Sequence, residues 1–370
     1  MIKEILVNWR SPSQLIFFSL FLLAACNQPA KDEPTAITIR WKDGRAIAMV
    51  ISKDILRSIA EKDFPNQVEL RLAGRTGGGA IAGEFSIEPN AYLFTPLIPF
   101  TRGLQYEIFA KQVRLASICI PRDKTVPRLM GIYPSPDSVP QNLLKVYLVF
   151  SRPMLEGHAS SYIQLMDHRG DSLPNIFLHL PGELWNADRT ILTLWLDPGR
   201  IKRDLQPNQK FGPPLKRGEH YHLLISRLWP DQDGNALAQS YDKYFVATGR
   251  DTISPVIGEW KLTLPQKGSL QPLLVDLNEP LDFILLKNTI SLADSSGNPV
   301  PCRLDIENKE SLLEFKPQVP WSRGLYRLKI ESRLEDLAGN NLNRLFDLDL
   351  EHPVASAPAK DQFERDWRVN

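Results

Sequence analysis

The 370 residues are enough for two or three ordinary domains, and 44 basic side chains nearly balance 43 acidic ones, leaving a formal charge of +1. This balance gives no overall field that would attract nucleic acid, so no nucleic-acid partner is expected. Proline is abundant, at 30 residues, and cysteine is scarce, at three. This composition favours many short strands separated by turns, and it excludes a small disulfide scaffold.

The first 25 residues have the composition of a secretory signal. Lys3 and Arg10 precede an apolar run over 15–23, which ends in Leu-Ala-Ala before Cys26. The run is too short to cross a bilayer comfortably as a permanent helix. Leu-Ala-Ala-Cys resembles the bacterial lipobox, and this resemblance implies cleavage before Cys26 and acylation of its thiol. The alternative is an ordinary cleaved signal followed by a chance cysteine.

Residues 26–34 are polar and contain proline, which predicts a tether between the lipid and the first folded module. Within it, Lys31-Asp32-Glu33 is similar to a signal that some Gram-negative lipoproteins carry for export to the outer surface. We therefore expect an outer-membrane lipoprotein of the cell envelope that is exposed at the surface. The alternative reading of these three charges is a solvated tether.

One segment occurs three times along the chain. Residues 94–109 and 315–330 both contain a Pro-rich connection, an Arg-Gly turn and a Tyr-led strand with alternating apolar residues. Residues 214–225 repeat the second half of this pattern. A segment that recurs about every hundred residues in a non-helical chain indicates tandem modules of one fold.

The spacing of turn residues predicts about seven short strands in each module, which is typical of an antiparallel β-sandwich. The near absence of long amphipathic helices excludes a parallel α/β fold. In the first module we expect strands at 36–41, 46–51, 68–72, 84–87, 91–94 and 106–110 and one short helix at 54–62. The expected boundaries are a divergent first module at 35–121, a second module at 122–249 with an insertion at 197–210, a third module at 250–350 whose last strand is 345–350, and a flexible tail at 351–370.

The second and third modules share two further motifs. A strand followed by Pro-Met ends at Met154, and its counterpart ends in Pro-Leu at Leu281. An Asp followed by Gly-Asn precedes the last strand in both, at 231–235 and 336–340. These residues resemble the bacterial immunoglobulin-like domain of S-layer type, the SbsA-like domain. The resemblance implies extracellular spacer or adhesive modules and no shared reaction.

Two sets of residues are candidates for ligand contact. The insertion carries basic side chains, including Arg200, Lys202 and Arg203, and loops at the ends of a sandwich often display binding residues. Trp185 and Trp229 fall near turns, where an indole could stack on a sugar ring. The alternatives are a solvated basic loop and tryptophans that fill or cover the core.

Asp231, Asp233 and Asn235 superficially resemble a calcium loop. An EF-hand loop needs its glycine at the sixth place, whereas this glycine comes at the fourth. Turn chemistry explains the pattern better, so these three residues are only weak metal candidates and no cofactor is expected. Cys119 and Cys302 fall in different modules, and the sequence leaves open whether they pair or stay as isolated thiols.

No catalytic motif was found, so no catalytic residue is assigned and the chain is predicted not to be an enzyme. The prediction is a lipid-anchored envelope protein that acts as a binding, spacer or scaffold module. Its partners would be the membrane, through Cys26, and an envelope protein or polysaccharide. The first alternative is a carbohydrate-binding accessory of a glycan-uptake system, and a less favoured one is an envelope hydrolase.

Overall fold

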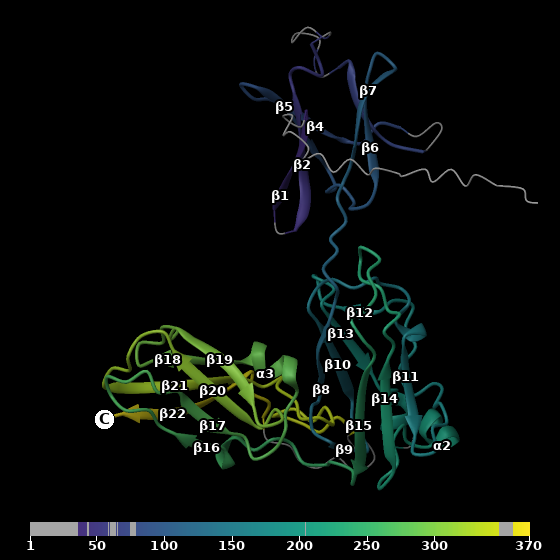
Figure 1. Ribbon diagram of the computed structural model, residues 1–370. Coiled ribbons are helices and arrows are strands. Elements are labelled where there is room, and N and C mark those ends of the chain that lie inside the picture. Colours follow the sequence, from purple (N-terminus) through teal and green to yellow (C-terminus); the bar gives the residue numbers. More distant parts are fainter. Residues whose placement is uncertain are drawn as a thin grey trace, which may run out of the picture. The chain divides into compact units, whose positions relative to one another are not determined.

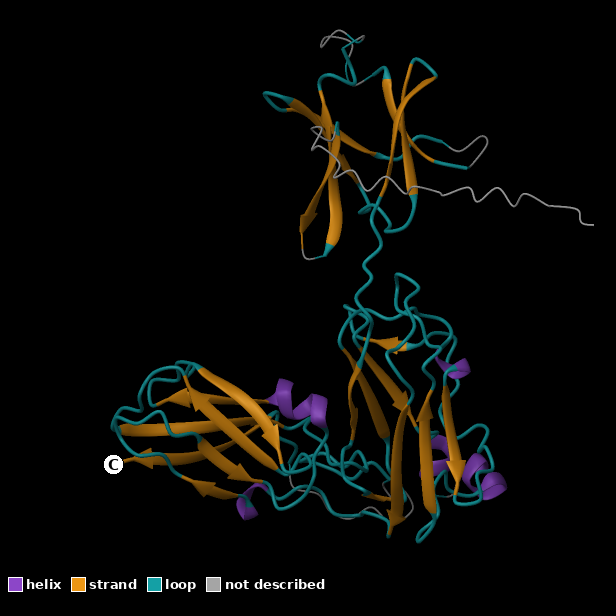
Figure 2. Cartoon of the chain, viewed as in Figure 1, coloured by secondary structure: helices purple, strands orange, loops and turns teal. Residues whose placement is uncertain are grey.

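The computed structural model describes residues 36–42, 44–57, 59, 64, 66–74, 79–203, 205–347 and 358–370. The predicted signal peptide, the tether and Cys26 lie outside these ranges. The chain divides into two compact units, Met1–Pro121 and Arg122–Asn370, and each is described by itself. Strands dominate both units (Figure 2), which confirms the predicted all-β fold class.

The first unit is one sandwich of two antiparallel sheets (Figure 1), with strand orders β1-β2-β5-β4 and β3-β6-β7. Its strands are β1 (Ile37–Lys42), β2 (Arg45–Ser52), β3 (Val68–Leu72), β4 (Gly83–Ile87), β5 (Ala91–Pro96), β6 (Gln105–Ala110) and β7 (Val113–Cys119). The sequence predicted the first six strands and missed β7. The expected helix is absent from the described part of 54–62, where 54–57 forms turns.

The second unit contains two sandwiches, which we call module two and module three; the first unit is module one. Module two has sheets β12-β13-β10-β8 and β11-β14-β15-β9. Its strands are β8 (Leu129–Tyr133), β9 (Ser138–Pro140), β10 (Lys145–Phe150), β11 (Ile163–Asp167), β12 (Leu184–Trp185), β13 (Ile191–Trp195), β14 (His220–Ile225) and β15 (Tyr241–Thr248). Its helices are the 3₁₀ turn η2 (Ala159–Ser161), α1 (Pro198–Ile201) and α2 (Gln206–Phe211).

Module three has sheets β16-β17-β20-β19 and β18-β21-β22. Its strands are β16 (Lys261–Thr263), β17 (Leu273–Asp276), β18 (Ile290–Asp294), β19 (Cys302–Glu307), β20 (Leu312–Pro317), β21 (Gly324–Glu331) and β22 (Gln362–Val369). Its helices are η3 (Ile257–Glu259) and α3 (Phe283–Thr289). With strands lettered A to G in chain order, modules one and three pair A-B-E-D in one sheet and C-F-G in the other, which is the constant-type immunoglobulin order. Module two keeps this order and adds an eighth strand, β9, which pairs in parallel with β15 at the edge of the second sheet.

The end of the chain corrects two predictions. Residues 345–347 are not a strand, and the expected flexible tail instead contains β22, which pairs along its whole length with β21. Trp367 and Val369 on β22 are 6% and 1% exposed and belong to the core of module three. Burial of these two side chains explains why the segment is ordered, because a two-sheet core needs its final strand.

The repeated Tyr-led segment forms the same corner in every module. The phenol oxygen of Tyr106 accepts a hydrogen bond from the Thr101 amide at 2.9 Å, and that of Tyr221 accepts one from Lys216 at 2.7 Å. Tyr326 bonds both backbone groups of Ser322 in module three. The three tyrosines lie near the starts of β6, β14 and β21, and each bonds the connection that precedes its strand. This arrangement is the tyrosine corner of immunoglobulin-like sandwiches. The repeat seen in the sequence is therefore a structural device, and each module keeps its own hydrophobic core.

Candidate functional site

The two motifs shared by modules two and three meet in space at one corner of each sandwich. Met154 of the Pro-Met segment forms a β-bridge with Asp231, and Leu281 forms the same bridge with Asp336. Each Asp also shapes its own turn: one carboxylate oxygen accepts two backbone amide bonds, from Asp233 and Asn235 or from Ala338 and Asn340. The Asp-x-x-Gly-Asn pattern is thus turn chemistry in both modules.

In module two, a guanidinium group neutralises this corner. Arg152 lies 3.0 Å from Asp231, 2.7 Å from Asp233 and 3.1 Å from Asp123. Hydrogen bonds from Thr125, together with the Arg152 charge, lower the pKa of Asp123 to about 2. The Arg152 side chain is 11% exposed and Asp231 is fully buried, so the weak calcium candidates Asp231 and Asp233 already hold an internal cation.

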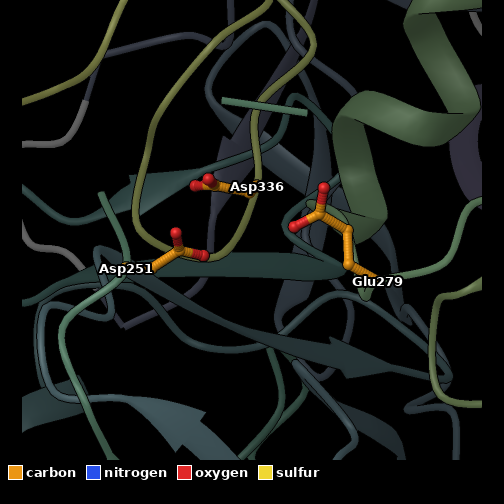
Figure 3. A group of neighbouring side chains, drawn as sticks. All are labelled: Asp251, Glu279 and Asp336. Atoms are coloured by element: carbon orange, nitrogen blue, oxygen red, sulfur yellow. The ribbon is translucent and has the colours of Figure 1, made fainter. Parts of the chain in front are cut away.

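Module three has a carboxylate where module two has this guanidinium. Glu279 takes the place of Arg152, Asp251 that of Asp123 and Asp336 that of Asp231. One oxygen from each of the three carboxylates lies within 4.8 Å of the others, and the side chains point toward a common space (Figure 3). We call these three residues the acidic corner.

The acidic corner favours protonated carboxyl groups. Burial is the main cause that raises the pKa of Asp336 to about 7, and the charge of Asp251 adds to it while bonds from Asn340 oppose it. Burial, then Asp336 and Asp251, raises the pKa of Glu279 to about 7 as well. Hard cations such as Ca²⁺ take oxygen ligands at about 2.3–2.6 Å, so oxygens within 4.8 Å of one another are close enough to share such a cation, while protonation of the carboxyl groups is the other way to neutralise the corner.

Beside the acidic corner, a buried ionic group joins modules two and three. Lys145 of β10 lies 2.6 Å from Glu335 and 3.2 Å from Asp282, and its side chain is 12% exposed. The Tyr147 hydroxyl donates a 2.7 Å hydrogen bond to Asp282. Asp282 also caps α3 by accepting the amide bonds of Ile284 and Leu285. We call Lys145, Tyr147, Asp282 and Glu335 the junction network.

Further contacts complete this junction. Tyr133 stacks on Phe283 with ring centroids 3.5 Å apart, and the Leu144 amide bonds the Leu337 carbonyl at 2.9 Å. The Asn142 side chain bonds both backbone groups of Asp251. The remaining cavity has a volume of about 10 Å³, so it has space for a water molecule at most. These contacts join modules two and three directly within the second unit.

The structure gives the basic insertion an internal role. The Arg200 guanidinium donates to the backbone carbonyls of Asn175, Gly212 and Pro213. The Lys202 ammonium lies 4.6 Å from the centre of the Phe346 ring, and Arg203 pairs with Asp347 at 3.1 Å. These contacts hold α1 and α2 against the body of the second unit. Ligand binding by the three residues stays a prediction, and it would have to compete with these contacts.

The two candidate tryptophans are placed in or against the core of module two. Trp229 has no exposed surface, which corrects the prediction that it contacts a ligand. Trp185 is half-buried against Trp229 and Phe150, and its indole donates a 2.7 Å bond to Glu183. A tryptophan before Pro230 looks like a loop residue in the sequence, because no local pattern reveals that the turn folds inward.

Cys119 and Cys302 are free thiols, and desolvation by burial raises the pKa of Cys302 to about 11. Among the described residues no helix is both long and apolar enough to cross a membrane. The residue patterns of the sequence predicted neither the acidic corner nor the junction network. An Arg-to-Glu exchange between aligned repeats was the available signal for the acidic corner.

The fold and this corner define the chain as a tandem array of immunoglobulin-like β-sandwich modules. No known family profile matches the sequence, and no curated protein matches it. Membership of the SbsA-like family therefore stays a prediction.

Solved structures match at low similarity. Native alpha-2-macroglobulin from Escherichia coli, domains MG0-NIE-MG1, has a TM-score of 0.23 at 12% identity over 55% of this chain and 66% of that one. Surface layer protein SbsC, domains 1–6, gives 0.23 at 12% identity over 55% and 24%. The titin fragment I67–I69 gives 0.20 at 13% identity over 71% and 82%. At these scores the likenesses carry no conclusion about function.

Proposed function

We propose that the chain is a lipid-anchored, non-enzymatic module of the cell envelope that acts as a spacer or scaffold. The observation that carries the proposal is the junction network. Buried charges such as Lys145 and Asp282 are costly to bury unless they are paired, and they fix geometry between two sandwiches more than they stabilise them. We infer that modules two and three form a rigid pair that follows the tethered module one in the chain. Such a pair suits a protein that holds a partner at a set distance from a surface.

The anchoring part of the proposal is tested by acyl labelling. Cells that express the full chain should incorporate radiolabelled palmitate into it, and Cys26→Ala should abolish the label. Cys119→Ala is the matched control, because that thiol lies in module one and should leave the label unchanged. Absence of label from the unaltered chain ends the anchoring claim.

The rigid pair is tested by small-angle scattering on residues 122–370. The unaltered fragment should fit one fixed arrangement of two sandwiches. The double change Lys145→Met and Glu335→Gln should loosen it and raise the radius of gyration without unfolding either module. Scattering that already requires many arrangements in the unaltered fragment would refute a spacer role.

One observation favours a second candidate, the carbohydrate-binding accessory. Tyr244 on β15 is 65% exposed, its ring stacks on His222 at 4.2 Å, and it borders an open hollow of about 480 Å³ that Asp242 and Met130 also line. An exposed aromatic ring beside carboxylates can stack on a pyranose and accept its hydroxyl bonds. Affinity electrophoresis in gels that contain soluble polysaccharides tests this role, with Tyr244→Ala losing retention and Val319→Ser, at an exposed side chain of module three, as control.

The third candidate, an envelope hydrolase, remains a prediction. Assaying residues 27–370 against esterase, peptidase and glycosidase substrates tests it directly. If the purified protein hydrolyses one of these substrates and a single substitution abolishes that activity, the hydrolase candidate replaces the scaffold proposal.

A further inference from the structure

Module one has an exposed apolar loop tip. Ile98 and Leu97 are the most exposed large apolar side chains in the described part of the chain, at 79% and 75%. Pro96 and Pro99 flank them, and both ends of the loop are held by the backbone: the Leu97 amide bonds the Ala82 carbonyl at 3.0 Å, and the next β-bridge follows at Phe100. Two adjacent aliphatic side chains held outward in this way are unfavourable in water and indicate a contact surface.

Strand register brings basic and aromatic side chains to the same end of the sheet. Lys42 pairs with Arg45 at the end of the β1–β2 hairpin, and Pro96 closes β5 at that end. The Arg102 guanidinium lies 4.5 Å from the centre of the Trp41 ring and donates to the Gly44 carbonyl at 2.9 Å.

We call this set the tip surface. It consists of Trp41, Lys42, Arg45, Leu97, Ile98 and Arg102. Trp41 is 41% exposed, and both Lys42 and Arg45 are exposed. The three charged members of the surface, Lys42, Arg45 and Arg102, are all cations.

We infer that the tip surface rests on an anionic lipid bilayer. Aliphatic side chains enter the boundary between headgroups and acyl chains, tryptophan is favoured at that boundary, and lysine and arginine are attracted to anionic lipids. A protein partner would satisfy the apolar pair equally well. The cations at the same end of the sheet, with the tryptophan, favour lipid because the charge complements a bilayer surface.

The proposed tether is long enough for this contact, which rests on the membrane anchoring proposed above. β1 begins at Ile37, at the end of the sheet away from the tip surface. The strand has six residues and spans about 20 Å, whereas the eleven residues from Cys26 to Ile37 can reach about 36–40 Å when extended. The lipid can therefore lie beside the tip surface.

Module three supplies an internal comparison. Its copy of the loop has Gln318 and Val319 between Pro317 and Pro320, where module one has Leu97 and Ile98 between prolines. Val319 is 58% exposed. The same loop therefore exists with a polar residue in place of one aliphatic side chain, and exchanging the two pairs changes the apolar surface with little change in the fold.

The test uses residues 27–370, which lack the acyl group but keep every described residue. The protein is sedimented with vesicles of phosphatidylcholine alone or of phosphatidylcholine mixed with phosphatidylglycerol. We expect binding to the anionic vesicles that weakens as salt is added. The double change Leu97→Gln and Ile98→Val should weaken it by about tenfold, and Lys42→Gln with Arg45→Gln should weaken it on anionic vesicles and reduce its salt dependence.

The control is Val319→Ser, which should leave vesicle binding within about twofold, since module three lacks the adjacent pair. All changed side chains are exposed, so circular dichroism and thermal unfolding should match the unaltered protein. Binding that is absent, or unchanged by Leu97→Gln and Ile98→Val, overturns the inference. If the protein self-associates and Leu97→Gln with Ile98→Val abolishes this association, the bilayer inference is overturned and a second copy of the chain is the partner. Acyl labelling at Cys26 is independent of this assay, so the two proposals can fail separately.

Discussion

Modules two and three share a strand order and a turn, yet they neutralise the same corner in opposite ways. In module two, Arg152 balances three aspartates within the chain. In module three, Glu279 replaces it, and the carboxyl groups of Glu279 and Asp336 have pKa values raised to about 7. The turn itself is unchanged, because its backbone bonds depend only on the Asp231 or Asp336 carboxylate. Fold and charge at this corner are therefore separable.

The last strand differs between the modules as well. In module two, β15 starts six residues after Asn235, whereas in module three β22 starts at Gln362, far beyond Asn340. The final strand can thus be supplied from a distance as long as it brings the core side chains that the sheet needs. Both differences suggest experiments that would break or sharpen the comparison.

The largest effect is expected from the core residue of the distant strand. Trp367→Ala should lower the free energy of unfolding of module three by about 3–5 kcal/mol, because it removes a buried indole that packs on Trp321 and Tyr326. Urea denaturation followed by fluorescence measures the loss. Arg368→Ala, on the exposed face of the same strand, is the control and should change stability by less than about 0.5 kcal/mol.

The second-largest effect is expected when the internal cation of module two, Arg152, is removed. Arg152→Met should lower the free energy of unfolding by about 3 kcal/mol near neutral pH, because the buried Asp231 loses its charge partner. The loss should shrink in acid, where the carboxyl groups protonate. Denaturation at a series of pH values measures both parts. A loss that is the same at every pH would mean that Arg152 acts through packing alone.

The third effect concerns the acidic corner and has the opposite sign with pH. Folded pKa values of about 7 for Glu279 and Asp336 lie above their ordinary values of 4.5 and 3.8. The folded state therefore binds protons more tightly, and the stability that it gains below about pH 4 is lost as the pH rises through about 7. Glu279→Gln should flatten this fall and stabilise module three by about 1–2 kcal/mol above neutral pH.

Thermal unfolding across this pH range, with excess EDTA and with excess calcium chloride, checks the third prediction. Glu156→Gln, at an exposed carboxylate of module two, is the control and should leave the profile unchanged. A fall in stability that persists in Glu279→Gln would place its origin elsewhere. If calcium removes the fall in the unaltered protein alone, a cation rather than a proton balances the carboxylates.

The smallest effect is expected at the junction between the two modules. Tyr147→Phe removes one hydrogen bond to Asp282, and burial, followed by the Asp282 charge, keeps the pKa of this phenol raised so that it stays a donor. Because Lys145 still pairs with Asp282, we expect a loss of only about 0.5–1 kcal/mol. Denaturation of residues 122–370 measures it, with Tyr244→Phe on the exposed face of β15 as control. No loss would show that Lys145 alone holds the network.

Local patterns were enough to predict the sandwich fold. Alternating apolar residues predicted most strands, and the Asp-x-x-Gly-Asn turn and the Tyr-led segment follow from backbone chemistry within a few residues of each other. Missed features depend on distant partners. No side chain of β7 is fully buried: Val113, Arg114, Ser117 and Cys119 are exposed and the other three are half-buried, so its apolar alternation is weak. The candidate ligand residues Arg200 and Trp229 were interpreted as surface groups because their partners lie elsewhere in the chain.

The sequence by itself determined the number of modules, their strand types and the turns, because each of these depends on periodicity and on residues close in the chain. Only the tertiary structure decided that the C-terminal segment completes module three, that Lys145 meets Asp282, and that Glu279 faces Asp251 and Asp336. These outcomes depend on which groups lose water together, and burial of that kind is a property of the packed chain that no local window of sequence contains.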